Sequence, residues 1–294
     1  MISAAFWLRE LGALRSPAND IIRLSEVITS ERFGPIDPKY REYAEDIHKC
    51  AVYLMGLIIQ RVDAANSKNR KNDLEHKPGE TLALHDLRSA LNGIIGFSEI
   101  IAKELFGLIE NGYPAYAESI HASGICLLDT TSDMLDLARL ETGNIVLDER
   151  GVDVARAVQE ALRVTMPQAT ERGVTLTWLS STTNLPNLYC DRRYLRQMLV
   201  NLLSSGAKFD RAGGLVELGT DLSDGFSIVT RDTGWGIQMD NLRLLVTKGL
   251  TERHGGNFSM VSTSNDGNTV RLSFPPERIL RDAPPPHNSA GVRP

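Results

Sequence analysis

A gapless internal repeat constrains this chain more than any other feature of its sequence. Residues 12–63 match residues 85–136 at a constant offset of 73 positions. Roughly 20 of about 50 aligned positions are identical, which predicts a duplicated structural unit. Clear identities pair Leu14 with Leu87, Ser25 with Ser98, Phe33 with Phe106, Tyr40 with Tyr113 and His48 with His121. The copies differ at one position of chemical interest, because Gly12 stands opposite His85.

Each copy is expected to form a helical hairpin. Apolar residues recur with a helical period in the second copy, at Leu87, Leu91, Ile94, Ile95, Ile101 and Leu105. Gly107 and Gly112 interrupt this pattern before a second helix over about 114–140, which Gly143 ends. The first copy has the same plan. We therefore expect helical hairpins over 1–66 and 81–143, joined by a polar linker over 67–80.

The second half of the chain differs in its predicted secondary structure, because short strands alternate with helices. Strands are expected at 144–147, 174–179, 215–218, 226–230, 258–262 and 270–274, and helices at 152–169, 191–209 and 242–253. This order predicts an α/β sandwich over 144–277. The proline-rich segment 278–294 is expected to be disordered. The fold class is thus multidomain, with helical hairpins forming a four-helix bundle followed by an α/β sandwich.

Composition excludes several classes of protein. The formal net charge of −5 argues against a nucleic-acid partner. No apolar run approaches the roughly 20 residues of a membrane span, so no membrane association is expected. The three cysteines are scattered and odd in number, which fits reduced thiols of a cytoplasmic protein without disulfides or a metal site.

The segment from His85 to Glu99 carries the clearest chemical signal. A neutral imidazole is a competent nucleophile near neutral pH, and a carboxylate at Asp86 can orient the ring or take its proton. Ser89 follows one helical turn later on the same face. This order of residues resembles the phospho-acceptor box of two-component sensor histidine kinases. The resemblance implies that His85 is phosphorylated, that Ser89 helps to place water for dephosphorylation of a partner, and that this partner is a response-regulator receiver.

The same resemblance, over about residues 81–277, implies an ATPase-like domain of the GHKL type. Asn201 and Lys208 match the family's first nucleotide box, and Ser205 stands where the family has a second, magnesium-binding asparagine. Metal ligands would thus be Asn201 and Ser205, although a serine hydroxyl is the weaker ligand.

A second nucleotide box is intact at Asp232, Gly234 and Gly236. In the family this aspartate accepts a hydrogen bond from the adenine amino group. Only 17 positions then separate Ile237 from His254, about half the family's usual spacing or less. We therefore expect that the lid and the second glycine-rich box, which hold the triphosphate, have been deleted.

Three functions remain open. The first hypothesis is a phosphorelay protein in which His85 exchanges phosphate with receiver aspartates, without ATP and downstream of another histidine kinase. The second is an ATP-dependent histidine kinase that uses ATP and magnesium to phosphorylate His85. The third is a non-catalytic adaptor. The deletion favours the first over the second, and the intact acceptor segment argues against the third.

The repeat also predicts the assembly. Family hairpins pair across two chains, whereas this chain carries two hairpins and can build the bundle alone. A flexible linker of about 15 residues spans about 20 Å, enough to join neighbouring hairpins. We expect a monomeric pseudo-dimer, in which Gly12 is a lost acceptor and His48 and His121 are structural.

Overall fold

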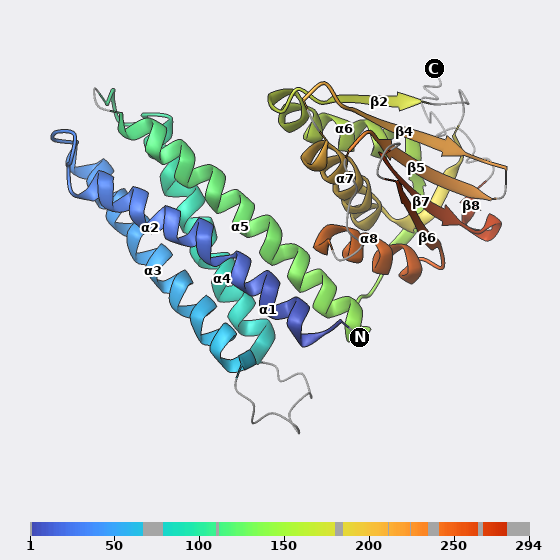
Figure 1. Cartoon of the computed structure of the whole chain (residues 1–294), viewed down its shortest axis with the longest axis horizontal. Coiled ribbons are helices and arrows are strands. Elements are labelled where there is room, and N and C mark those ends of the chain that lie inside the picture. The colour runs from blue at the N-terminus through green and yellow to red at the C-terminus, as the bar shows by residue number, and fades with distance from the viewer. Residues whose placement is uncertain are drawn as a thin grey trace, which may run out of the picture. The chain divides into compact units, whose positions relative to one another are not determined.

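The computed structural model describes residues 2–66, 79–109, 112–179, 185–210, 212–223, 225–234, 241–263 and 267–280. They divide into two compact units, Met1–Glu141 and Thr142–Pro294 (Figure 1). Most of the expected linker and tail lies outside the described residues. The linker was expected to reach residue 80 and the tail to begin at residue 278. Residues 79–80 instead belong to a helix, and Ile279–Leu280 form a short strand. No helix in the described part of the chain is long and apolar enough to cross a membrane.

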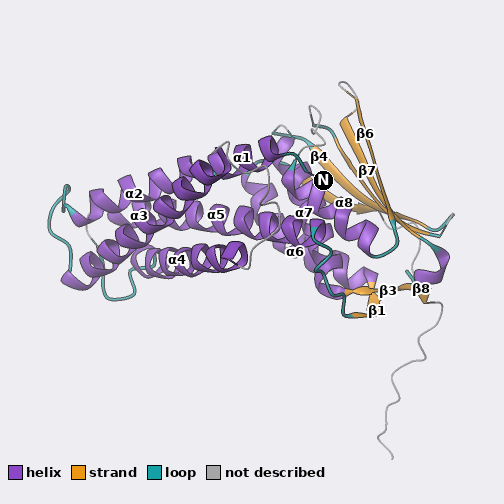
Figure 2. Ribbon diagram, turned by 90° about the horizontal axis from the view of Figure 1, so that it is seen from below, coloured by secondary structure: helices purple, strands orange, loops and turns teal. Residues whose placement is uncertain are grey.

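The first unit is helical throughout. Its helices are α1 (Ala4–Ala13), α2 (Arg15–Thr29), α3 (Pro38–Asn66), α4 (Gly79–Ala102) and α5 (Tyr113–Glu141). Helix α2 packs on α3 and α5, and α4 packs on the same two helices, while α1 packs mainly on α3 (Figures 1 and 2). The first helix of each hairpin therefore contacts both second helices. In the described residues, α2 with α3 and α4 with α5 form two hairpins, and the four helices pack together as a bundle.

The two hairpin turns have the same backbone conformation at the repeat offset. Glu31 and Glu104 have φ of 50° and 52°, and Gly34 and Gly107 have φ of 117° and 120°. Non-glycine residues rarely adopt positive φ, so the matching glutamates are informative. The two hairpin turns therefore share their backbone conformation at these two pairs of positions.

Tyrosines link the hairpins reciprocally. The Tyr40 hydroxyl accepts a hydrogen bond from the backbone N–H of Phe106 at 2.7 Å and donates to the carbonyl oxygen of Gly107 at 2.9 Å. At the repeat offset, the Tyr113 hydroxyl accepts from the N–H of Phe33 at 2.9 Å and donates to the carbonyl of Gly34 at 2.8 Å. The rings of Phe33 and Tyr116, and of Tyr43 and Phe106, stack in the same reciprocal manner. Contacts of this kind are isologous, as in a two-fold symmetric dimer.

The symmetry fails near the position that lacks the histidine. In the first copy the helix is interrupted at Leu14, which caps the end of α1 and the start of α2. In the second copy α4 runs without interruption through the equivalent Leu87. The helix around Gly12 is therefore broken where the helix around His85 is continuous.

The second unit is a two-layer α/β sandwich. Its elements are β1 (Glu149–Asp153), α6 (Val154–Glu171), β2 (Thr175–Leu179), β3 (Asn187–Asp191), α7 (Arg192–Phe209), β4 (Leu215–Asp221), β5 (Phe226–Asp232), α8 (Leu242–Arg253), β6 (Asn257–Thr263), β7 (Gly267–Phe274), η1 (Pro276–Arg278) and β8 (Ile279–Leu280). The main sheet has the order β2-β4-β5-β7-β6, and β1-β3-β8 form a small second sheet. Helices α6, α7 and α8 cover one face of the main sheet (Figures 1 and 2).

Helix α7 supplies the centre of this core. Its apolar residues recur with a helical period and are all buried, at Leu195, Met198, Leu199, Leu202 and Leu203. Asp191 caps its start by accepting a hydrogen bond from the backbone N–H of Arg193. Apolar periodicity therefore predicted both the existence and the inner face of this helix correctly.

The predicted strand over 144–147 is wrong. The strand begins instead at Glu149, where β1 pairs antiparallel with β3. Val146 is highly exposed, so an apolar residue alone did not indicate a strand there. Strands β3 and β8 were not predicted, because each is a short segment stabilised by its neighbour in the sheet.

Candidate functional site

The acceptor segment lies on α4, in the described part of the bundle. His85 belongs to this helix, but its side chain lies outside the described residues. Leu87 and Ala90 are buried against the bundle, whereas Asp86 and Ser89 are exposed. The segment therefore buries its apolar face in the bundle. Asp86 and Ser89, the predicted polar partners of His85, are exposed to solvent.

His48 contacts the first helix of its own hairpin. Its Nδ1 lies 3.1 Å from the hydroxyl of Ser25, a fully buried serine. The Ser25 hydroxyl donates its hydrogen to the carbonyl of Ile22, so the imidazole must be the donor to Ser25. This contact agrees with the prediction that His48 is structural.

Residues of the first nucleotide box share one polar face of α7. Asn201, Ser204 and Ser205 are buried, and both serines lie about one helical turn after Asn201. Lys208 follows one turn later in an exposed position. The backbone carbonyl of Lys208 accepts a hydrogen bond from Arg172 at 3.3 Å. The predicted Asn201, Ser205 and Lys208 therefore lie on one face of α7.

One group that meets this face, Arg243, was not predicted from the sequence. Arg243, in the first turn of α8, places Nη1 2.9 Å from the Ser204 hydroxyl. The Asn201 amide donates to the carbonyl oxygen of Arg243 at 3.4 Å. By contrast, the Ser205 hydroxyl is 2% exposed and has no hydrogen-bond partner among the described residues. The sequence signal for Arg243 lies in the segment 241–244, which falls where the family has the motif G-L-G-L and has lost both glycines.

The donor set predicted for magnesium consists of two neutral side chains, Asn201 and Ser205. Magnesium prefers carboxylate oxygens in octahedral geometry, but the predicted ligands are one amide and one hydroxyl. A guanidinium already bonds the neighbouring Ser204. Within the described ranges, no group of three or more His, Cys, Asp or Glu residues could hold a metal ion.

Asp232, the predicted adenine-binding residue, ends β5 and is largely buried. Its Oδ1 accepts hydrogen bonds from the Asn268 amide at 2.6 Å and from the backbone N–H of Gly234 at 3.0 Å. Burial raises the pKa of Asp232 against the opposing effect of these hydrogen bonds. Gly234 is therefore part of the site through its backbone. Gly236 and the rest of segment 235–240 lie outside the described residues.

The backbone of α7 approaches Asp232 closely at one point. A Cβ atom added to Gly206 would lie 3.6 Å from Cβ of Asp232 and 2.9 Å from a methyl carbon of Val216. Glycine thus allows α7 to rest on the sheet beside the aspartate, and the two predicted nucleotide boxes become neighbours.

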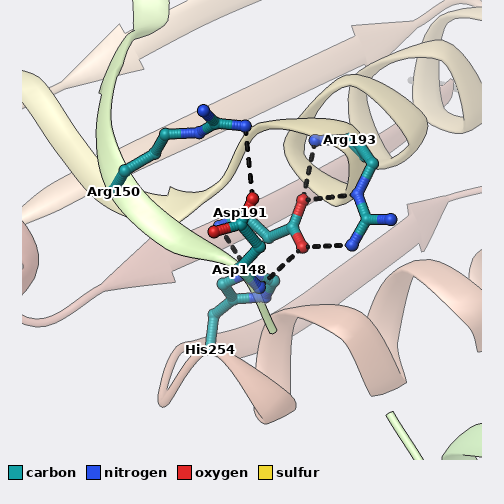
Figure 3. Close-up of polar contacts among 5 residues, drawn as sticks. All are labelled: Asp148, Arg150, Asp191, Arg193 and His254. Atoms are coloured by element: carbon teal, nitrogen blue, oxygen red, sulfur yellow. Dashed lines mark hydrogen bonds and ion pairs between the residues drawn. The ribbon is translucent and has the colours of Figure 1, made fainter. Parts of the chain in front are cut away.

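A polar cluster around the buried Asp191 and His254 connects the helices of the second unit (Figure 3). The Nε2 atom of His254 accepts a hydrogen bond from the backbone N–H of Asp191 at 3.1 Å, and its Nδ1 donates to the carbonyl of Leu250 at 2.7 Å. The Asp191 carboxylate accepts from the N–H of Asp148 and from the Arg193 guanidinium, the latter at 2.8 Å. The cluster therefore links the start of α7 to the end of α8.

Protonation states follow from these contacts. Burial opposes ionisation of Asp191, but hydrogen bonds from Arg193 and from backbone amides outweigh it and lower its pKa to about 2. Burial lowers the pKa of His254, which stays neutral in this tautomer. Sequence reasoning could have recognised Asp191 as a helix N-cap, but no local signal pairs it with His254, which is 63 residues away.

Known proteins resemble this chain over more than half of its length. Residues 83–143 match the His Kinase A (phospho-acceptor) domain. The chain is 32% identical over 232 residues to the cell-division control histidine kinase PdhS of Brucella anthropi, covering 67% of this chain and 22% of that protein. It is 33% identical over 231 residues to an uncharacterized sensor-like histidine kinase of Rhizobium meliloti, covering 68% and 44%. The chain thus spans less than half the length of these relatives.

A solved structure shares the fold. The crystal structure of full-length ShkA in complex with AMPPNP aligns with a TM-score of 0.58 and 25% identity, over 71% of this chain and 48% of that one. The sequence relatives, the matched acceptor domain and this structural likeness agree with one another. The chain therefore belongs to the two-component sensor histidine kinase family.

Proposed function

We propose that this chain acts in two-component signalling through a phosphoryl group carried on His85 and passed to the receiver aspartate of a response regulator. The observation that carries this proposal is the acceptor segment itself, which matches a phospho-acceptor domain and exposes Asp86 and Ser89 on a packed helix. In this proposal Asp86 orients the imidazole or takes its proton, and Ser89 positions water for dephosphorylation of the receiver.

The relatives favour ATP as the source of the phosphoryl group. Similar proteins are named histidine kinases, and the similar ShkA structure holds AMPPNP. Asp232 is buried with one oxygen already bonded, as expected of a residue that recognises a base amino group. An ATP-dependent kinase is therefore better supported than the phosphotransfer-only hypothesis, and Asn201, Lys208, Asp232, Gly234 and Gly236 are its proposed nucleotide residues.

Transfer between receivers without ATP is the second candidate. The observation that favours it is the contact between Arg243 and Ser204, beside the position where the family binds magnesium. Phosphoryl transfer from ATP depends on neutralising the phosphates with metal and basic groups. In this candidate, an upstream histidine kinase phosphorylates a receiver, and His85 takes the phosphate from it.

One labelling experiment distinguishes the candidates. The full chain is incubated with γ-labelled ATP and magnesium, and separately with a labelled phospho-receiver, using wild type, His85→Gln and the matched control His121→Gln. We expect acid-labile label in wild type and His121→Gln but none in His85→Gln. Label from ATP supports the kinase, and label only from the receiver supports the second candidate. Absence of label from both sources, together with tight receiver binding, would support the adaptor hypothesis and contradict the proposal.

We also infer that one chain forms the complete bundle. The support is the packing of α2 with α5 and of α3 with α4, together with the reciprocal tyrosine contacts at both turns. In this arrangement the first hairpin occupies the place of a second chain. Multi-angle light scattering is expected to give a monomer, and a concentration-independent dimer would contradict the inference.

A further inference from the structure

The chain that connects the two units is bonded to the second unit. It runs from Thr142, just after α5, to Asp148, just before β1. Arg253, in the last turn of α8, donates from Nη2 to the carbonyl oxygens of Gly143 at 3.3 Å and of Ile145 at 3.1 Å. One guanidinium therefore holds the connection at two carbonyls near its start.

Two further features hold the rest of residues 143–148, hereafter the strap. The Ile145 side chain is 3% exposed, whereas the next side chain, Val146, is 86% exposed. The Asp191 carboxylate accepts a hydrogen bond from the backbone N–H of Asp148 at 3.0 Å (Figure 3). These hydrogen bonds join the strap to the end of α8 and to the start of α7, all within the second unit.

The bonded strap shortens the tether between the units. Thr142 alone separates the end of α5 at Glu141 from the strap. The chain turns where the strap begins, because Gly143 has φ of 70°, a conformation that favours glycine. Release of the strap would lengthen the tether from residue 142 to residues 142–148, and a flexible chain of that length spans about 15 Å on average.

The acceptor position lies close to the start of this tether. Helices α4 and α5 form an antiparallel hairpin in which Gly124 packs against Ile94 and Ile95. Counting along both helices from this contact, His85 stands level with a point on α5 that is about 10 Å from the end of that helix. A short tether at this end keeps the second unit within reach of His85. A longer flexible tether lowers the effective concentration, roughly as the −3/2 power of its length.

We propose that Arg253 is a positioning residue for phosphorylation of His85, because its bonds to the strap keep the tether short and the ATPase-like unit close to the acceptor. The inference rests on the proposed kinase function. Arg253 lies about 15 Å along α8 from Arg243, which contacts the face of the proposed nucleotide residues. Loss of Arg253 should therefore slow phosphorylation without weakening the binding of nucleotide.

Labelling of the full chain separates these two effects. Wild type, Arg253→Ala, Arg253→Lys and the control Lys248→Ala are incubated with magnesium and a range of γ-labelled ATP concentrations. Lys248 is another cation of α8, but it pairs with Glu252 at 3.9 Å. At saturating ATP, Arg253→Ala should label His85 more slowly by about threefold or more, with a KM for ATP within about twofold of wild type. A lysine can still donate to a carbonyl, so Arg253→Lys should restore part of the rate, and Lys248→Ala should match wild type.

Cleavage of the strap gives a readout that needs no ATP. Thermolysin cuts before apolar residues such as Val146, and it cuts faster where local opening releases the chain from its contacts. Within residues 143–148, Arg253→Ala should be cut about fivefold faster or more than wild type and Lys248→Ala. Circular dichroism melting confirms that each variant is folded.

Three results would overturn the inference. Equal cleavage of Arg253→Ala and Lys248→Ala would show that Arg253 does not hold the strap. Faster cleavage with unchanged or faster labelling would show that the strap does not position the unit, and a raised KM at an unchanged maximal rate would assign Arg253 to nucleotide binding. The proposed function fails separately: wild type that takes label from a phospho-receiver but not from ATP would remove the kinase and this positioning role, and would leave phosphotransfer through His85 intact.

Discussion

At the scale of single residues, Gly206 lets α7 lie close to the sheet. A methyl group at this position would lie 2.9 Å and 3.0 Å from the two γ-carbons of Val216, a stiff β-branched side chain. Gly206→Ala is expected to destabilise the second unit by about 1–3 kcal/mol, as overpacking usually does.

Gly56→Ala is the matched control, because nothing lies within 4 Å of the added methyl group in the middle of α3. It should stabilise the first unit by about 0.5–1 kcal/mol through helix propensity. Urea unfolding of both variants measures the difference. Equal stability of Gly206→Ala and wild type would show that α7 can move away from the sheet at no cost.

His254 makes the second unit sensitive to acid. Its neutral form accepts the Asp191 N–H, and burial lowers its pKa, so the unfolded state binds the proton more readily than the folded state. Stability should therefore fall as the pH drops below about 6.5, the unfolded value, toward the lowered folded pKa. Asp191 should cause a separate loss of stability at lower pH, as the pH falls from the usual pKa of an aspartate to about 2.

Urea unfolding between pH 8 and 5 measures this effect. His254→Gln keeps an amide that can accept the Asp191 N–H, and it should lose the pH dependence near 6 while remaining folded at pH 8. His48→Gln is the control, since its ring lies in the first unit. A pH dependence that persists unchanged in His254→Gln would assign it to other groups.

At the scale of elements, the turns of the two hairpins depend on tyrosine hydroxyls. Tyr40→Phe leaves the N–H of Phe106 and the carbonyl of Gly107 without their partner, and Tyr113→Phe does the same at Phe33 and Gly34. Each substitution is expected to cost about 1–3 kcal/mol of bundle stability.

The control for these variants is Tyr53→Phe, because Tyr53 is 53% exposed on α3. Thermal unfolding should give similar losses for Tyr40→Phe and Tyr113→Phe and no loss for Tyr53→Phe. A large loss at only one of the two positions would show that the reciprocal contacts are not energetically equivalent.

At the scale of the whole molecule, the bundle is expected to hold one reactive histidine. The first copy lacks the carboxylate that follows His85, since Ala13 stands in its place, and its helix is interrupted at Leu14. Returning a histidine to position 12 should therefore not restore an acceptor. The double variant Gly12→His/His85→Gln is expected to take no label from a phospho-receiver or from ATP.

Intact-mass measurement provides the complementary readout. Wild type should gain one phosphoryl group per chain, and Gly12→His alone should also gain only one. Two groups on Gly12→His, or any on the double variant, would mean that the first hairpin remains competent once its histidine is restored.

Local patterns in the sequence determined most of the elements. The 3.6-residue period of apolar side chains predicted α7 with its buried face, because a helix buries residues that are close in the chain. The repeat predicted hairpins that the structure forms, and the order of residues from His85 to Ser89 indicated the family.

Contacts between distant residues were decided only by the tertiary structure. Strands β3 and β8 exist because neighbouring strands supply their hydrogen bonds, and such partners leave no period in the sequence. Asp191 with His254, and Ser204 with Arg243, are separated by 63 and 39 residues. Their pairing follows from the way α7 and α8 pack on one sheet, since burial forces polar groups to find partners wherever the fold brings them together.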